Sequence, residues 1–173
     1  MAQGSLSSHH YMKERMIEIT CPHCGHVFHI KRDTFCIAGM NDACDKHLQD
    51  GTYFTHQCSK CKNLFYMTYP FLYRDPKKKY YLILSSRKEI DNLPKDEQVV
   101  VCRDVHQFLF AYKVLSSDLN LKTMISLKKK WEKQFKNARF ESYDSKNGCI
   151  WLEHEGKLVA IKLSDEKKEK LRS

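Results

Sequence analysis

Two hydrophobic patterns follow one another along the chain. Through residue 102, apolar residues recur in short alternating runs, which predicts strands over residues 16–20, 27–30, 52–57, 64–69, 80–84 and 98–102. Pro70 breaks the pattern after the fourth of these runs. Near the C-terminus the alternation returns and predicts three more strands, joined by turns at 145–148 and 155–156, over residues 140–143, 149–154 and 158–163.

Between these stretches the apolar period lengthens to about 3.6 residues, which predicts two helices. Asp104 can cap the first, whose inward face carries Val105, Leu109, Tyr112 and Leu115. Asn120 can cap the second, which carries Leu121, Ile125, Trp131 and Phe135. One or two further helical turns fit residues 43–48, and the last ten residues read as a charged, frayed tail.

Composition narrows the class of protein. A chain of 173 residues with 42% hydrophobic residues can bury one ordinary core, and this length excludes a large two-domain enzyme. No apolar run approaches the roughly 20 residues of a membrane span, and the N-terminus lacks the apolar segment of a secretory signal. We therefore expect a cytoplasmic protein whose eight cysteines serve as metal ligands or free thiols.

Two Cys-x-x-Cys pairs carry the strongest chemical signal. Cys21 and Cys24 form one pair, Cys58 and Cys61 form the other, and 33 residues separate them. Zn²⁺ prefers four soft ligands in a tetrahedron, and each pair places two sulfurs along one edge of it. Short predicted strands flank both pairs, as in a zinc ribbon. A shell closed by four thiolates leaves no position for water, so we expect a structural ion and no enzymatic activity.

The residues around the pairs suit this geometry. Pro22 presets φ in the first turn, and Gly25 can take the positive φ that turns backbone N–H groups toward sulfur. Asn63 is suited to the same bend after the second pair. Lys60 and Lys62 can offset the net charge of −2 that four thiolates leave on the ion.

Other interpretations of the cysteines remain open. A thioredoxin-like redox pair and four unlinked buried cysteines both fit the sequence. Cys36, Cys44 and His47 are candidates for a partial second metal site, although buried thiols and a solvated histidine explain them more simply. The same holds for the histidines near the first site, His23, His26, His29 and His56. Cys102 and Cys149 lie in apolar runs and are predicted to be core residues.

Positive charge is the second signal. The net charge is +9, with +4 over residues 1–84, zero over 85–127 and +5 over 128–173. Both basic regions contain a lysine triplet, Lys77–Lys78–Lys79 and Lys128–Lys129–Lys130. A basic surface attracts nucleic acid or acidic proteins, yet neither triplet has the interleaved aromatics of an RNA-binding strand. A solvated face is therefore the favoured interpretation.

The sequence resembles the bacterial CpXC family. The likeness rests on Ile19-Thr20-Cys21-Pro22-His23-Cys24, on Gly51-Thr52-Tyr53-Phe54, on Cys58-Ser59-Lys60-Cys61 and on the Tyr69–Pro76 stretch, YPFLYRDP. It covers about residues 17–130 and implies a zinc-binding domain of uncharacterised activity. It carries over Cys21, Cys24, Cys58 and Cys61 as ligands and nothing catalytic. Lys62-Asn63 departs from the glycine that a ribbon usually has there.

These observations predict an α+β protein: a zinc ribbon with a small antiparallel sheet, two helices and a C-terminal β-meander. The expected parts are a flexible leader over 1–16, the CpXC-like domain over 17–130, a β extension packed on it over 131–163 and the tail over 164–173. We expect a non-enzymatic module that binds a protein partner, with Tyr73 and Arg74 as candidate contacts. The alternative is a nucleic-acid-binding ribbon that uses Lys60, Lys62 and both lysine triplets.

Overall fold

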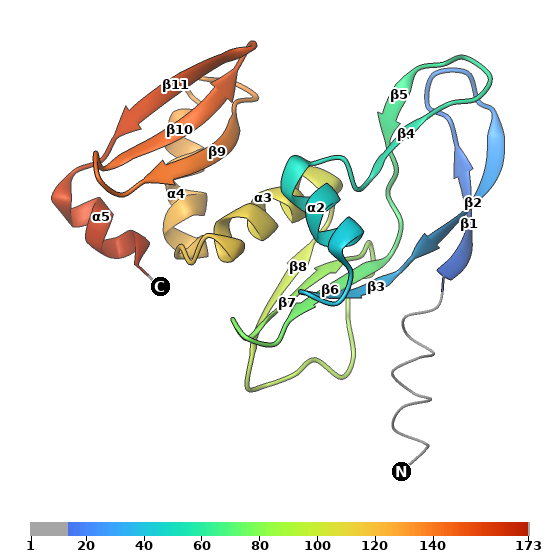
Figure 1. The fold of residues 1–173 in the computed structure, drawn as a ribbon, viewed down its shortest axis with the longest axis horizontal. Helices are drawn as coiled ribbons and strands as arrows, with labels where there is room; N and C mark the ends of the chain where they lie inside the picture. The colour runs from blue at the N-terminus through green and yellow to red at the C-terminus, as the bar shows by residue number, and fades with distance from the viewer. Residues whose placement is uncertain (1–13, 173) are drawn as a thin grey trace. The chain divides into compact units, whose positions relative to one another are not determined.

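A computed structural model describes residues 14–172, and within that range the protein is α+β with four helices and eleven strands in several small sheets (Figure 1). It divides into two compact units, the first ending at Leu109 and the second beginning at Phe110. Within the described range, none of the helices has the length and apolar character that a membrane crossing demands.

The elements follow the chain in this order: β1 (Glu14–Thr20), β2 (Val27–Asp33), β3 (Phe35–Ile37), α2 (Asp42–Asp50), β4 (Thr55–Gln57), β5 (Leu64–Tyr66), β6 (Phe71–Asp75), β7 (Tyr80–Leu84), β8 (Gln98–Cys102), α3 (Val105–Ser116), α4 (Leu121–Trp131), β9 (Arg139–Asp144), β10 (Cys149–His154), β11 (Lys157–Lys162) and α5 (Asp165–Leu171).

Two antiparallel hairpins stand at one end of the first unit. β1 pairs with β2 from Glu14 opposite Asp33 to Thr20 opposite Val27, and β4 pairs with β5. Alternation gives each hairpin an inner face, and the two inner faces meet where the Phe28 ring stacks on His56 at 4.6 Å and meets Phe65 edge-on. These contacts hold together the hairpins whose turns carry the Cys-x-x-Cys pairs.

A four-stranded sheet in the order β3-β6-β7-β8 also belongs to the first unit, together with α2 and the start of α3. This sheet is mixed, whereas an antiparallel sheet was predicted: β6 and β7 pair antiparallel, but β3 with β6 and β7 with β8 pair in parallel. Phe71 and Tyr73 of β6, with Leu82 and Leu84 of β7, alternate toward its buried face. The rings of Phe54, Tyr69, Phe71 and Phe108 pack edge-on or tilted at 5.5–6.4 Å and fill the adjoining core.

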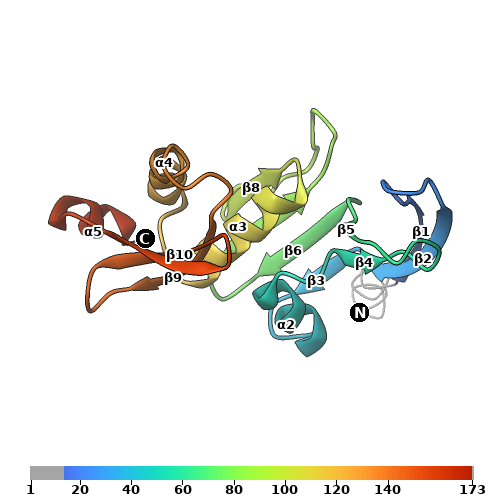
Figure 2. The same cartoon turned by 90° about the horizontal axis from the view of Figure 1, so that it is seen from above.

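The second unit is built on the predicted β-meander, in which β10 is the central strand and β9 and β11 lie on either side. Ile150 and Leu152 of β10 are fully buried with Phe140 of β9. Helix α4 lies over one face of this sheet in both cartoon views (Figures 1 and 2). Trp131 at the end of α4 meets Phe110 edge-on in the same core.

The two expected helices are confirmed as α3 and α4, although α4 ends at Trp131 and does not reach Phe135, and Asn120 caps α4 through a side-chain oxygen that accepts from Thr123 N–H. α2 forms where one or two helical turns over residues 43–48 were expected, whereas the prediction that the C-terminal residues form no helix was wrong, because α5 is also formed. α5 lies where a frayed tail was expected. Its single apolar anchor, Leu171, is 1% exposed, and the Leu171 carbonyl accepts a 2.8 Å hydrogen bond from Asn120 N–H.

Several strand boundaries also differ. β7, β8 and β10 have the predicted limits, whereas β4 begins at Thr55 and β5 ends at Tyr66, both inside the predicted runs. β3 and β6 were not predicted. Pro70 precedes β6 instead of ending the sheet, because a proline just before a strand removes no ladder hydrogen bond. β1 includes residues 14–16, the end of the expected leader, and residues 1–13 lie outside the described range.

Four residues predicted for the core are not fully buried, and one of them is Leu109 of α3, which is half-buried. Ile125 is 41% exposed on the outer face of α4, and Phe135 is half-buried beyond the end of that helix. Cys149 is half-buried, and its thiol donates to the Asn147 carbonyl at 3.4 Å. Cys102 is buried, as predicted.

Candidate metal centre

The two Cys-x-x-Cys turns have the same backbone hydrogen-bond pattern. In the first, Cys21 N–H donates to the His26 carbonyl and Gly25 N–H donates to the Cys21 carbonyl, both at 2.9 Å. In the second, Cys58 N–H donates to Asn63 at 3.0 Å and Lys62 N–H donates to Cys58 at 2.9 Å. Each turn therefore folds back on its first cysteine and presents both of its sulfurs on one side.

The position of positive φ differs from the prediction in the second turn. Gly25 has φ of 76° as expected, but the matching residue is Lys62, with φ of 65°, and not Asn63. Lys62 occupies the place that glycine has in the first turn, one residue after the second cysteine. A left-handed conformation at a lysine costs roughly 1–2 kcal/mol, which the hydrogen bonds of the turn must offset.

The two turns bring all four thiols together. Cys21 Sγ lies 3.7 Å from Cys61 Sγ, and Cys24 Sγ lies 3.6 Å from Cys58 Sγ. All four sulfurs lie within 4.8 Å of one another. A tetrahedron with Zn–S bonds of about 2.3 Å has edges of about 3.8 Å, so the spacing fits a four-thiolate ion. It exceeds the roughly 2.05 Å of a disulfide bond, and the cysteines are free.

Backbone donors are directed at these sulfurs. His23 N–H donates to Cys21 Sγ at 3.4 Å, and Cys61 N–H donates to Cys58 Sγ at 3.5 Å. The Cys61 N–H, with the Lys60 N–H acting in the same direction, lowers the pKa of the Cys58 thiol to about 6. Thiolate is the form that binds a metal, so these donors favour the metal-binding form of Cys58. The pKa of Cys24 is instead raised to about 11, because the lowering effect of the His26 backbone is outweighed by burial and by hydrogen bonds with the other three thiols.

Asn63 has a role other than the bend predicted for it. Its backbone N–H and then its side-chain amide lower the pKa of Cys61, and Nδ2 lies 3.4 Å from Cys61 Sγ. The sequence signal was an asparagine two residues after the last cysteine of the second pair, for which only a role in backbone conformation was predicted.

The other predicted metal ligands do not join a cluster. His23, His26, His29 and His56 lie outside the four-cysteine group, and His56 stacks on Phe28. Within residues 14–172, Cys36, Cys44 and His47 form no second group of three. The Cys44 thiol donates to Cys36, which lowers the pKa of Cys36 and raises that of Cys44, while His47 Nδ1 bonds Thr52 Oγ1 at 2.8 Å.

The residues considered for partner binding are placed as follows. Tyr73 is 2% exposed, and its hydroxyl donates to Asp45 at 3.0 Å, so it is a core residue of β6 and not a surface contact. Arg74 pairs with Glu97 at 3.1 Å and lies over the Tyr81 ring. Lys77, Lys78 and Lys79 are exposed in the turn after β6. Lys128 instead pairs with Glu132 and lies over Phe110, which leaves Lys129 and Lys130 as the exposed part of that triplet.

Fold and site together define a class: a small α+β protein with a four-cysteine centre, built from two matching turns, that can hold a metal ion. The chain belongs to the CpXC family, whose description is CpXC protein and whose match spans residues 19–170. The match continues through β9, β10 and β11, well beyond residue 130, where the resemblance in the sequence had ended. No curated protein and no solved structure matches the chain.

Proposed function

We propose that Cys21, Cys24, Cys58 and Cys61 hold one structural Zn²⁺ in a zinc-ribbon arrangement of the two hairpins. The supporting observation is the convergence of four sulfurs from two matching turns, with spacings near a tetrahedral edge. Zinc suits four thiolates in a tetrahedron because it imposes no geometry of its own and favours soft ligands. Four protein ligands complete its shell, so the ion would tie hairpins together without activating water.

The test is metal content per chain, measured on protein purified without a polyhistidine column, followed by thermal melts with and without a chelator. One zinc per chain and a melt that collapses with chelator support a structural ion. A metal-free chain with an unchanged melt would contradict it and favour a redox role for the cysteine pairs.

We further propose that the protein is a cytoplasmic, non-enzymatic module that binds a protein partner through its hairpins. Four large apolar side chains are exposed on these hairpins, namely Met16, Val27, Leu64 and Tyr66. Met16 and Val27 lie on the outer face of one hairpin, and Leu64 and Tyr66 lie on the outer face of the other. Apolar residues exposed together on one face are typical of interaction surfaces. With Tyr73 buried, the hairpins take the place of the YPFLYRD stretch as the surface to test.

Leu64 and Leu158 offer a matched pair of variants, because both are 64% exposed and they lie in different units. A tagged chain recovered from the cells that produce it should retain a stoichiometric partner. Leu64→Lys should lose that partner, whereas Leu158→Lys, with the same change in charge, should keep it. Equal loss in both variants, or no stoichiometric partner, would refute the hairpin surface.

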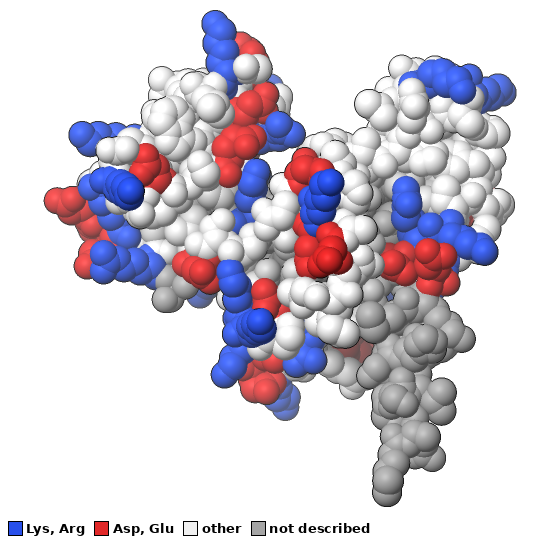
Figure 3. Space-filling view, viewed as in Figure 1, with Lys and Arg blue, Asp and Glu red and all other residues white. Residues whose placement is uncertain are grey.

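Nucleic-acid binding is the second candidate. One observation favours it: Lys130 of α4 lies beside Lys167 of α5 and lowers the pKa of Lys167, so two cations gather where an anion would relieve their repulsion. On the face shown in Figure 3, however, basic and acidic groups are interspersed within each unit.

The test of this candidate is binding to a short DNA duplex and to single-stranded RNA over a range of salt concentrations. A phosphate-binding surface predicts affinity that falls steeply with salt, and charge reversal at Lys129 and Lys130 and at Lys77–Lys79 should lower the slope by nearly one per lost contact. Absence of binding at low salt would eliminate this function.

A further inference from the structure

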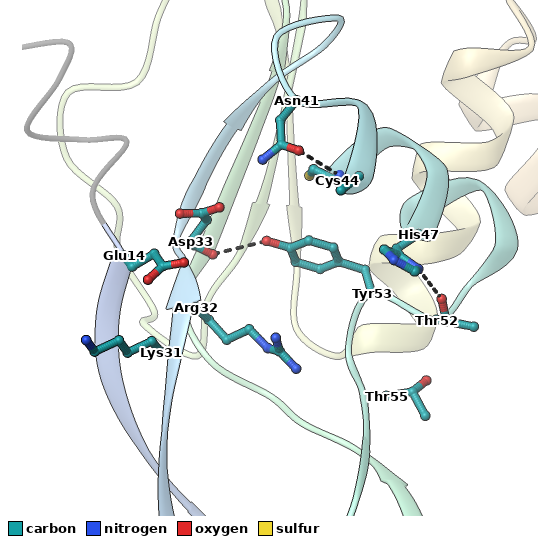
Figure 4. A pocket seen from close by; sticks show the side chains of 11 residues that line it. Glu14, Lys31, Arg32, Asp33, Asn41, Cys44, His47, Thr52, Tyr53 and Thr55 are labelled. Atoms are coloured by element: carbon teal, nitrogen blue, oxygen red, sulfur yellow. Dashed lines mark hydrogen bonds between the residues drawn. The ribbon is translucent and has the colours of Figure 1, made fainter.

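A cavity of about 450 Å³ lies within the first unit, outside the metal centre (Figure 4). On one side it is lined by the open end of the β1–β2 hairpin, and on the other by α2 and the segment that follows it. The hairpin side contributes charged residues, while the opposite side contributes hydroxyls, an imidazole and the ring of Tyr53. The volume falls within the range of about 300–1,000 Å³ that is usual for small-molecule sites.

Arg32 is the central cation of this cavity. Because side chains alternate along β2, Arg32 lies on the same inner face as Phe28 and Ile30, which are both half-buried. In Figure 4 its guanidinium extends from β2 into the space below Tyr53, on the side of Thr55. Its Nε is buried and makes no hydrogen bond to any residue in the described part of the chain. Buried donors normally have a partner, and a carboxylate or phosphate is the acceptor that fits a guanidinium fork.

Two carboxylates line the same cavity at the hairpin end. Glu14 lies directly opposite Asp33 in the β1–β2 register, and like charges in that position destabilise a strand pair. Burial, with the neighbouring charge of Glu14 in addition, raises the pKa of Asp33, and the charge of Arg32 offsets only part of this. The Tyr53 hydroxyl donates a 3.2 Å hydrogen bond to the backbone carbonyl of Asp33, and this bond fixes the end of the hairpin against the segment after α2. A cation bound here would relieve the repulsion between the two carboxylates.

A guanidinium that needs an anion and a carboxylate pair that needs a cation therefore share one small cavity. We propose that this cavity binds a free amino acid, with its α-carboxylate on Arg32 and its α-ammonium at Glu14 and Asp33. A simple anion would satisfy Arg32 and be repelled by the carboxylates, and a simple amine would meet the reverse problem. A zwitterion satisfies both, and the proposal is independent of the metal centre.

The first experiment uses the full-length, metal-loaded chain. Each of the proteinogenic L-amino acids is added separately and the thermal melt is recorded, and any stabilising amino acid is then titrated calorimetrically. We expect saturable binding of at least one. If none binds, the proposal is wrong, whatever the metal analysis shows.

Two variants test whether Arg32 contributes to binding. Arg32→Met keeps most of the stem and removes the charge, and it should weaken binding roughly tenfold or more, as loss of a charged hydrogen bond does. Lys46→Met removes an exposed cation of α2 that does not line the cavity, and this variant should bind as the unaltered chain does. Equal binding by Arg32→Met and the unaltered chain would overturn the proposal.

Ligand derivatives test the second subsite on the unaltered chain, so this result stands even if Arg32→Met does not fold. The N-acetyl derivative of the binding amino acid lacks the ammonium, and its amide lacks the carboxylate. Both should bind at least tenfold more weakly. If the N-acetyl form binds as tightly as the free amino acid, the site is a plain anion site and the zwitterion proposal is refuted.

Discussion

Single sulfur atoms decide whether the centre can hold its ion. Structural zinc sites contribute an apparent 10–16 kcal/mol, roughly the whole stability of a domain, so losing one thiol should prevent the first unit from folding. We expect Cys58→Ser to lose both the metal and the cooperative melt of this unit. Cys149→Ser, which alters a half-buried thiol outside the cluster, should keep both. A metal-free Cys58→Ser chain that still melts cooperatively would contradict the structural role.

The side chain of Asn63 acts on a single ligand, Cys61, and this contact predicts the pH at which the metal is released. Because its amide lowers the pKa of Cys61, Asn63→Ala should raise that pKa and let protons compete with the ion at higher pH. Acid titration of the loaded protein with a chromogenic zinc dye should show release at a higher pH in the variant. The sign follows from the depressed pKa, since thiolate persists above it and is lost as pH falls through it. An unchanged midpoint would show that the contact has no influence on the ligand.

At the scale of elements, the two cysteine turns can be compared directly. Lys62→Gly should relieve the left-handed lysine and stabilise the loaded protein by up to about 1 kcal/mol, after the extra flexibility of glycine in the unfolded chain is subtracted. Gly25→Ala should cost about 1–2 kcal/mol from backbone strain alone, because a Cβ there would meet no atom within 4 Å. Denaturant unfolding of zinc-loaded protein measures both, and shifts of the same sign would refute the equivalence of the turns.

Helix α5 gives the second prediction at this scale. Leu171 is fully buried and its carbonyl binds the start of α4, so Leu171→Ala should destabilise the second unit by about 2–5 kcal/mol. Both tryptophans of the chain, Trp131 and Trp151, lie in this unit, and their fluorescence reports its unfolding. Lys170→Ala on the exposed side of the same helix serves as the control. Equal midpoints for the two variants would restore the interpretation of this segment as a frayed tail.

The sequence predicts those elements whose pattern is local. β7, β8 and β10 have their predicted limits because short apolar runs bounded by turn residues define them, and the four cysteines are found from spacing alone. α5 has one apolar anchor among charged residues, so it shows no amphipathic period. β6 was missed because a proline before a strand resembles a break within one. The cavity joins Glu14, Arg32 and Tyr53, which no local pattern connects.

For the whole molecule, the division into two units predicts that removal of the metal unfolds the first unit and leaves the second folded. All four proposed ligands lie in the first unit and both tryptophans in the second. Chelator should therefore expose the cysteines of the first unit to a thiol reagent while the tryptophan emission maximum stays at its native wavelength. A red shift that parallels thiol exposure would show that the two units unfold as one.

The 33 residues between the cysteine pairs have a consequence for loop-closure entropy. An ion held by both pairs closes this segment into a ring, and each doubling of a ring's length adds only about 0.6 kcal/mol to the entropic cost. β3 and α2 lie inside the ring, yet the distance that the ion spans is set by the two turns alone. The cost of closure therefore changes little when residues are inserted into the exposed stretch between β3 and α2, and the segment can vary in length without loss of the centre.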